Sequence, residues 1–367
     1  MRILHVYKDY PPVLGGIELH LRDLAEALAL RGHHVTALVT GPGSRTVTSV
    51  ERGVEVVRCP RLFTAASTPV SPALALEVRR RRADVTHLHI PYPVAEGAWL
   101  AGGRRPMVAT YHSDIVRQRF LGRLWAPVLN RTLDRADRVL ATSPVYANTS
   151  PFLNGRSNVT VVPLGIDPTP FLEADRDAAR GRYGPGPIVL FVGRLRYYKG
   201  VDVLLAALDG LPDATLLVVG TGPQAPELAK VADALGLKDR VKWLGDVGSG
   251  DLPGVFAASD LFVLPAVARS EAFGVVQLEA MAAGLPTITT ELGTGTSWVT
   301  QHGETGLVVP PRDAGALRSA MRELLSDPIR AREMGRAGRA RMLSLFTRDH
   351  MVEAVVQVYE TAVGRSS

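Results

Sequence analysis

Cysteine is nearly absent, since Cys59 is the only one in the sequence of 367 residues. A single thiol cannot form a disulfide within the chain or supply a cysteine-rich zinc site, so a reducing compartment is expected. The sequence also has no apolar run of roughly 18 residues, the length that a membrane-spanning helix needs. Charge and proline occur too early after Met1 for a signal peptide. We therefore expect a cytoplasmic protein rather than a secreted or integral-membrane one.

Nucleic-acid-binding motifs are also missing, although the first half of the chain is basic. Residues 1–170 contain 21 Arg and Lys against 13 Asp and Glu, whereas residues 171–367 contain 21 against 23. Such an excess favours a phosphorylated substrate or an anionic membrane surface, and nucleic acid is the least favoured partner. A solvated surface explains any single arginine cluster equally well. The clustered arginines are Arg79 to Arg82, Arg104, Arg105, Arg117, Arg119 and Arg123.

Short apolar segments alternate with helical segments along the whole chain, a pattern typical of parallel α/β sheets. A first series of predicted strands comprises 3–7, 34–39, 54–58, 85–89, 107–111, 138–142 and 158–162. A second series comprises 188–192, 216–219, 241–244, 261–264, 287–290 and 306–309. The two series predict two Rossmann-like domains with a proline-rich boundary near 165–187, followed by a helical tail over 328–367.

Two glutamates lie at the start of a helix that is predicted to begin near Gly274. Glu271 precedes this helix, and Glu279 is expected one to two turns inside it. The free backbone N–H groups of a helix start bind sugar hydroxyls or phosphate oxygens. Two carboxylates at different depths could then accept hydrogen bonds from a ribose and a hexose. Taken alone, the pair also fits a solvated loop and a helix surface.

Two cations lie in the loop Gly193–Gly200, directly after the predicted strand 188–192. Loops at the carboxyl ends of parallel strands are where open α/β sheets bind ligands. The planar guanidinium of Arg194 and the compact ammonium of Lys199 can together neutralise a diphosphate leaving group, which removes the need for a metal. A basic surface loop is the alternative interpretation.

The first predicted strand is followed by a loop that contains Gly15 and Gly16, whose backbone amides can come close to phosphate or acceptor groups. A tight turn is the simpler interpretation. The dinucleotide fingerprint G-x-G-x-x-G is absent, and the second strand ends in Thr40-Gly41 without the acidic residue that holds an adenosine ribose. A nicotinamide-dependent oxidoreductase is therefore disfavoured.

Three histidines are expected near strand ends in the first half of the chain. His112 directly follows the strand 107–111, and His87 and His89 alternate on the preceding strand. A third metal ligand is not found at a suitable spacing along the sequence. We therefore predict that His87 and His89 line a cleft or the core and do not form a metal site.

Taken in order, these motifs resemble those of the family 4 retaining glycosyltransferases. Glu271 and Glu279 match the E-x7-E signature of that family. The other matching segments are Pro11–Gly16, Pro163–Asp167, Gly193–Gly200, Gly220–Pro223 and Gly303–Leu307. The resemblance implies the GT-B fold, in which two Rossmann-like domains face a cleft and the C-terminal helix crosses back to the first domain. The expected domains are 1–168 on the acceptor side, 169–345 for the nucleotide sugar, and the helix 346–367.

The resemblance also implies roles for individual residues. The residues expected to act in catalysis are His112, which would contact the donor sugar, and Glu271, Arg194 and Lys199. The residues expected to bind the donor are Gly15, Gly16, Arg194, Lys199, Gly222, Phe273, Gly274, Val275, Val276 and Glu279. Weaker candidates for the acceptor are Glu18 and Asp114. The donor is a nucleoside-diphosphate sugar, and no metal or other cofactor is expected.

The donor sugar and the acceptor are less closely defined by the sequence. The run Tyr111–Gln118 is similar to O-antigen-type mannosyltransferases that use GDP-mannose, with UDP-glucose or another UDP-hexose as the alternative donor. The expected acceptor is a glycan or a polyprenyl- or lipid-linked hydroxyl, with peripheral contact to the inner face of the membrane. A nucleotide-sugar 2-epimerase shares the architecture, and a non-catalytic sugar-nucleotide sensor is a further alternative. The intact set of Glu271, Glu279, Arg194 and Lys199 argues against the sensor, which need not retain cations for a leaving group.

Overall fold

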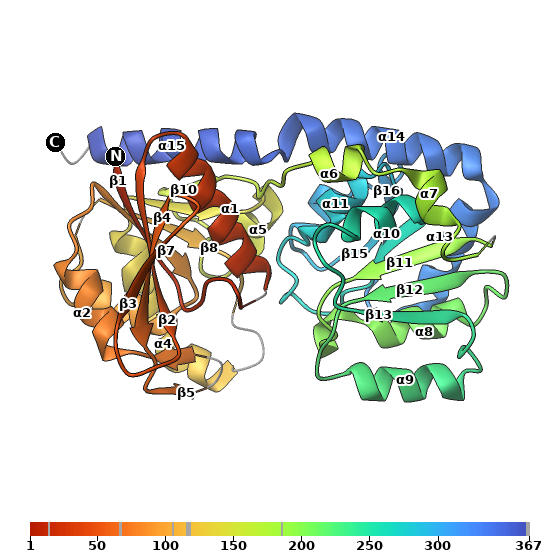
Figure 1. Cartoon of the computed structure of the whole chain (residues 1–367), viewed down its shortest axis with the longest axis horizontal. Helices are drawn as coiled ribbons and strands as arrows, with labels where there is room; N and C mark the ends of the chain where they lie inside the picture. The colour runs from red at the N-terminus through yellow and green to blue at the C-terminus, as the bar shows by residue number, and fades with distance from the viewer. Residues whose placement is uncertain (14, 66–67, 105, 115–118, 185, 365–367) are drawn as a thin grey trace. The chain divides into compact units, whose positions relative to one another are not determined.

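The computed structural model describes residues 1–13, 15–65, 68–104, 106–114, 119–184 and 186–364. The chain divides into two compact units (Figure 1). Unit 1 comprises residues 1–164 and 348–367, and unit 2 comprises residues 165–347. These divisions fall close to the expected boundaries at 168 and 345. Within the described ranges, no helix combines the length and the apolar character needed to cross a bilayer.

Unit 1 is built on a sheet whose strand order is β10-β9-β8-β7-β1-β2-β4-β3. Its strands are β1 (Arg2–Val6), β2 (His34–Gly41), β3 (Val47–Glu51), β4 (Val54–Pro60), β7 (Val85–Ile90), β8 (Met107–Tyr111), β9 (Arg138–Ala141) and β10 (Val159–Val161). All neighbouring strands are parallel except β3, which pairs antiparallel with β4. Every residue of β7 and β8 is buried, because the helices of a parallel sheet cover both faces.

The helices of unit 1 are α1 (Gly16–Leu30), α2 (Pro72–Arg80), α3 (Pro93–Leu100), α4 (Arg119–Arg135), α5 (Pro144–Thr149) and α15 (Arg348–Gly364). A separate hairpin is formed by β5 (Phe63–Ala65) and β6 (Thr68–Val70). The predicted helical tail is two helices, because it is interrupted after Leu345 and resumes at Arg348. The second of these, α15, is held to β7 by a 2.6 Å hydrogen bond between the Tyr359 hydroxyl and Nδ1 of His87.

Unit 2 contains a parallel sheet with the order β13-β12-β11-β14-β15-β16. Its strands are β11 (Ile188–Val192), β12 (Thr215–Val219), β13 (Val241–Gly245), β14 (Leu261–Leu264), β15 (Thr287–Thr290) and β16 (Gly306–Val309). Its α-helices are α6 (Thr169–Leu172), α7 (Arg176–Arg180), α8 (Val201–Leu208), α9 (Ala225–Ala234), α10 (Leu252–Ala258), α11 (Val276–Ala282), α12 (Thr296–Val299), α13 (Ala314–Ser326) and α14 (Pro328–Leu345). Helices α8 and α9 cover one face of the sheet and α10 covers the other (Figure 1).

The strand order of each unit reverses beside its first strand. In unit 2, β11 pairs with β12 on one side and with β14 on the other. In unit 1, β1 lies likewise between β2 and β7. The loops that leave the carboxyl ends of two such strands go to opposite faces of the sheet and leave a crevice there, which is where open α/β sheets bind ligands. The fold therefore directs attention to the loops after β11 and β14 in unit 2 and after β1, β7 and β8 in unit 1.

Candidate functional site

The loops after β11 and β14 are held together by their backbones. The N–H of Val267 donates to the carbonyl oxygen of Tyr198 over 2.8 Å. Gly200 has a φ of +68°, and a methyl group at this position would lie 2.0 Å from the carbonyl oxygen of Pro265. Only glycine combines this left-handed backbone with so close an approach. Lys199, which precedes Gly200, is thereby directed toward the loop after β14.

Lys199 and Glu271 form an ion pair across these two loops. The distance between Nζ of Lys199 and Oε2 of Glu271 is 2.6 Å, and each side chain is only 11% exposed. Burial by itself would lower the pKa of Lys199, but the carboxylates of Glu271 and Glu279 and the Tyr198 phenol outweigh it and raise that pKa. Lys199 therefore keeps its positive charge, and the predicted cation and the predicted acid meet in one place.

Arg194 lies on the same loop as Lys199 and is exposed. The next residue, Leu195, is buried, and its N–H donates to the carbonyl oxygen of Thr221 over 2.9 Å. A methyl group at Gly222 would lie 2.4 Å from the carbonyl oxygen of Leu195. Glycine at 222 is thus required for the loop after β12 to pack against the loop that carries Arg194. This is a structural reason for Gly222 in addition to its expected donor contact.

Hydrogen bonds from polar side chains hold the loop after β14. The Thr294 hydroxyl donates to the Glu271 carbonyl over 2.9 Å, and the Gln277 amide donates to the Phe273 carbonyl over 3.1 Å. The Thr300 hydroxyl in turn donates to Oε1 of Gln277 over 2.7 Å. Gly274 has a φ of +76°, which favours glycine. These bonds hold the backbone around Glu271 in one conformation.

Helix α11 begins later than predicted, at Val276 rather than near Gly274. Glu279 accordingly lies in its first turn and not one to two turns inside, because Gly274 adopts a left-handed conformation that delays the helix. Phe273 is 3% exposed and packs against Trp298 and Phe346. Val275 and Val276 are half-buried at the start of α11.

Trp243 is a surface residue of unit 2. Its side chain is 37% exposed on β13, which is an edge strand of the sheet. A tryptophan on an edge strand has a neighbouring strand on one side only, which leaves part of its side chain uncovered. Its indole is therefore available at the surface of unit 2.

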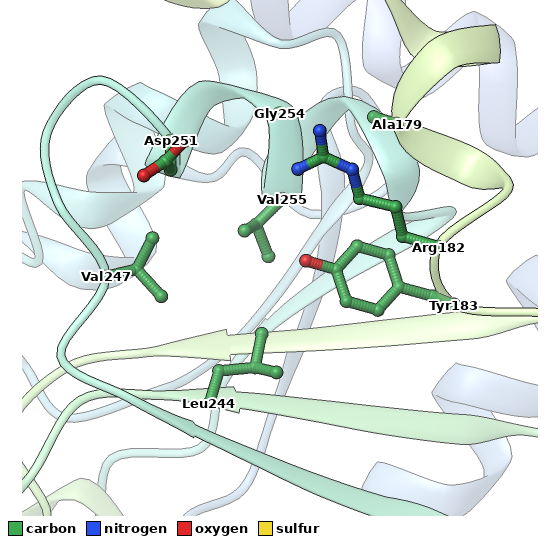
Figure 2. Close-up of a pocket in the computed structure, with 8 residues that line it drawn as sticks. All are labelled: Ala179, Arg182, Tyr183, Leu244, Val247, Asp251, Gly254 and Val255. Carbon is green, nitrogen blue, oxygen red and sulfur yellow. The ribbon is translucent and has the colours of Figure 1, made fainter.

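A separate cavity of about 160 Å³ lies beside β13 and α10 (Figure 2). Leu244, Val247 and Val255 supply apolar side chains, while Tyr183 and Arg182 present polar groups (Figure 2). The lining also includes Ala179, Asp251 and Gly254. None of the predicted site residues is among these eight, so the cavity is distinct from the loops that carry the charged residues.

In unit 1, His112 joins a cluster of buried imidazoles. Its Nε2 lies 2.9 Å from Nδ1 of His89, and Nε2 of His89 lies 3.1 Å from Nδ1 of His5. His20 on α1 packs edge-on against the His112 ring, with centroids 5.3 Å apart. His87 is bonded instead to two hydroxyl groups, those of Tyr359 and Thr110.

The search along the sequence found no third metal ligand, but the fold brings further imidazoles beside His87 and His89, both of which are buried. Nitrogen atoms of His5, His87 and His89 lie within 4.8 Å of one another, as do those of His20, His89 and His112. Sequence spacing could not reveal His5 and His20, because they come from β1 and α1, far from β7 in the chain. The only sequence signal is that His5 and His20 flank the Gly15-Gly16 loop.

The histidines of this cluster are neutral. Burial, followed by the nearby His20, lowers the pKa of His5 to about 3, and burial alone lowers the pKa of His20 to about 4. Burial and the neighbouring imidazoles hold the pKa values of His87, His89 and His112 well below the ordinary 6.5. Several positive charges cannot be accommodated so close together away from water. Each ring therefore carries one N–H and one acceptor nitrogen.

The other expected residues of unit 1 lie at two loop ends. Gly15 is the N-cap of α1, and a methyl group there would lie 2.2 Å from the carboxylate of Glu18, which is itself buried. At Gly16 such a methyl group would meet open space, apart from its chain neighbours and its own helix, within the described residues. Asp114 accepts hydrogen bonds from the Ser150 hydroxyl at 2.7 Å and the Tyr111 hydroxyl at 3.1 Å. Residues 115–118 of the mannosyltransferase-like run lie outside the described residues.

Two family models match consecutive parts of the chain. The model described as Glycosyltransferase Family 4 matches residues 14–169, and the model described as Glycosyl transferases group 1 matches residues 174–341. The matches therefore cover most of both units.

Individual relatives match over nearly the full length. The chain is 42% identical to the D-rhamnosyltransferase WbpZ of Pseudomonas aeruginosa, over 95% of this chain and 92% of the relative. It is 35% identical to the O-antigen chain mannosyltransferase C of Escherichia coli, over 100% of both chains. Among solved structures, the sucrose-phosphate synthase of Thermosynechococcus elongatus aligns with a TM-score of 0.84 and 26% identity, over 100% of both chains.

Acidification should destabilise the fold through the histidine cluster. The folded-state pKa values lie below the ordinary 6.5, so the unfolded chain takes up protons first as the pH falls. The stability that the cluster contributes is complete above about pH 6.5 and is lost progressively as the pH falls from about 6.5 through the folded-state pKa values of about 4 and about 3.

Urea unfolding across this pH range measures the effect. His20→Gln should reduce the dependence of the unfolding free energy on pH by up to about 1.4 kcal/mol per pH unit, because one proton uptake is removed. The matched control is His34→Gln, since His34 is exposed, and it should leave the dependence unchanged. Parallel curves for His20→Gln and the unchanged protein would contradict this assignment.

Proposed function

Since the chain belongs to the family 4 glycosyltransferases and has the GT-B fold, we propose that it transfers a D-mannose-like hexose from a nucleoside-diphosphate sugar, with GDP-mannose as the first candidate. The observation that carries this proposal is the buried Lys199–Glu271 pair, on the same side of unit 2 as the exposed Arg194. These residues lie at the switch point of unit 2, the place beside β11 where the strand order reverses. Two cations at the carboxyl edge of a parallel sheet suit a diphosphate.

The proposed reaction retains the configuration at the anomeric carbon. The bond between C1 of the hexose and the diphosphate oxygen breaks, and a bond from C1 to the acceptor oxygen forms on the same face. The acceptor proton passes to the leaving diphosphate. Arg194 and Lys199 stabilise the negative charge that develops on that group, so no metal is required for this step.

The remaining residues are assigned to binding. Glu271 and Glu279 accept hydrogen bonds from sugar hydroxyls, while backbone N–H groups around Val275 and Val276 and at Gly222 bind donor oxygens. Phe273 and Gly274 shape that loop. In unit 1, Gly15 and Gly16 supply backbone amides, His112 contacts the donor sugar, and Glu18 and Asp114 are candidates for the acceptor.

The configuration of the donor sugar is supported by two relatives. One is named for D-rhamnose and the other for mannose. D-Rhamnose is mannose without the hydroxyl at C6, so both sugars have the axial C2 hydroxyl that distinguishes mannose from glucose. A UDP-hexose is the alternative donor. A 2-epimerase would instead convert the donor to its epimer when no acceptor is present, which chromatography of the incubated donor would detect.

Thermal unfolding with GDP-mannose tests the donor and the role of Arg194 together. A ligand that binds only the folded protein at about a hundredfold excess over its Kd stabilises it by about 2.7 kcal/mol. GDP-mannose should therefore raise the Tm of the unchanged protein and of the control Arg196→Ala, whose arginine is exposed on the same loop. Arg194→Ala should lose most of this shift. A larger shift with UDP-glucose would overturn the donor assignment, and an undiminished shift in Arg194→Ala would overturn the role of Arg194.

We also propose a lipid-linked acceptor at an anionic membrane surface. Arg79 and Arg80 are exposed at the end of α2, whereas Arg81 is engaged in ion pairs with Glu55 and Glu77. On α4, the apolar side chain of Leu124 is 63% exposed. Exposed arginines and an exposed apolar side chain are the groups that contact anionic headgroups and the membrane interface, and they support this proposal.

Vesicle sedimentation tests this contact. The protein should bind vesicles that contain phosphatidylglycerol at low salt and be released at moderate salt, because screening weakens attraction between exposed charges. Vesicles of phosphatidylcholine alone are the control and should bind little. If phosphatidylglycerol vesicles do not bind at low salt, the membrane contact is excluded.

A further inference from the structure

The histidine cluster of unit 1 contains a continuous line of hydrogen bonds that the proposed chemistry does not use. His5 on β1 lies beside β7, where its register partner is His87 and where His89 points to the same face two residues later. The nitrogen pairs His5 Nδ1–His89 Nε2 and His89 Nδ1–His112 Nε2 are separated by 3.1 and 2.9 Å. Both separations are hydrogen-bond lengths. Three imidazoles are thus linked end to end, with His112 at the loop end.

The protons along this line are coupled. A neutral imidazole has one N–H and one acceptor nitrogen, and His89 uses both of its nitrogens in the line. Only two arrangements satisfy both hydrogen bonds. In one, all three rings carry the proton on Nδ1. In the other, all three carry it on Nε2. The state of His5 therefore dictates the state of His112, two residues along the line.

The inner end of the line distinguishes the two arrangements. Nε2 of His5 is buried and has no hydrogen-bond partner within the described residues. With the protons on Nε2, this atom would be a buried N–H group without an acceptor. With the protons on Nδ1, it is an unused lone pair. Buried N–H groups without partners are rarer in native proteins than under-used acceptors, so the Nδ1 arrangement is favoured.

We propose that His5 and His89 are positioning residues that fix the tautomer of His112, so that His112 presents a protonated Nδ1 as a hydrogen-bond donor to an oxygen of the sugar. This inference rests on the proposed contact between His112 and the donor sugar. It adds a direction to that contact: His112 donates a hydrogen bond and does not act as a general base. The acceptor proton must then go elsewhere, in agreement with its transfer to the leaving diphosphate.

The remaining members of the cluster are not part of the line. Both nitrogens of His87 are bonded to hydroxyl groups, at 2.6 Å to Tyr359 and 2.7 Å to Thr110. Hydroxyls can donate or accept, so His87 does not dictate the proton positions of its neighbours. His20 contacts the His89 and His112 rings from the side. His87 therefore offers a control with the same burial but a different hydrogen-bond pattern.

Long-range proton–nitrogen NMR of the ¹⁵N-histidine-labelled full-length protein reads the tautomers directly. We expect protonated Nδ1 and bare Nε2 at His5, His89 and His112 near neutral pH. His5→Phe should leave the tautomer of His112 mixed, because the line loses its inner donor. His5→Asn should restore it, since the amide nitrogen of asparagine can replace Nδ1 as donor. His87→Phe should leave the His112 tautomer unchanged.

Kinetics on the same variants measures the consequence for donor use. Loss of one oriented hydrogen bond should lower kcat/KM roughly fivefold to tenfold in His5→Phe, with recovery in His5→Asn. A protonated Nε2 at His112 in the unchanged protein overturns the proposal, as does an unaltered His112 tautomer in His5→Phe. A stoichiometric metal ion on these nitrogens in the purified protein also overturns it. If the tautomers are as expected but His112→Phe binds and uses the donor normally, the line is correct and the proposed sugar contact is wrong.

Discussion

The ion pair between Lys199 and Glu271 is the constraint on which the site of unit 2 depends. Taking two charges out of water costs free energy that their attraction only partly recovers, so such a pair is a poor device for stabilising a fold. What it does is hold one ammonium group at a defined place between the loops after β11 and β14. The contact requires glycine at 200, where the two backbones approach too closely for any side chain. The strand order, the close backbone approach at Gly200 and the ion pair therefore all place the candidate site between the loops after β11 and β14.

The buried polar groups of the two units differ in charge. Unit 2 keeps charged side chains at its switch point, where a diphosphate would be neutralised. Unit 1 gathers imidazoles that burial keeps neutral, so that they act through the direction of their hydrogen bonds and not through charge. A charged cluster next to a developing cation at the sugar would oppose the reaction. In the proposed reaction, a neutral hydrogen-bond donor would orient the sugar without that penalty.

Much of the fold could be predicted from the sequence, because buried parallel strands are continuous apolar runs. The strand predicted at 107–111 agrees with β8 (Met107–Tyr111), and that at 188–192 agrees with β11 (Ile188–Val192). Strand β3 was missed because it is an edge strand with mostly exposed residues and no apolar alternation. The start of α11 was predicted too early in the chain, because the left-handed conformation of Gly274 delays the helix until Val276. Trp243 is exposed because β13 is an edge strand, and the order of strands in a sheet cannot be read from the residues around Trp243.

The candidate residues were predictable where they directly follow predicted strands and were missed where they come together from distant elements. Arg194, Lys199 and Glu271 were identified by their positions after strands and by a family resemblance. His5 and His20 were not, because only the pairing of β1 with β7 and the packing of α1 bring them to His89. The proton positions in that cluster follow from the geometry of three rings together and from no single residue.

Calorimetric titration of GDP, which lacks the sugar, into two variants tests most directly whether the Lys199 ammonium holds the diphosphate. Glu271→Gln keeps this ammonium, while Glu271→Gln with Lys199→Met removes it without leaving a lone buried charge; Lys238→Met, at an exposed lysine, is the control. We predict that Glu271→Gln and Lys238→Met bind GDP about as tightly as the unchanged protein, and that the double variant binds at least about tenfold more weakly, the loss of one charge-assisted hydrogen bond. Equal affinity of the double variant and Glu271→Gln would contradict the central claim.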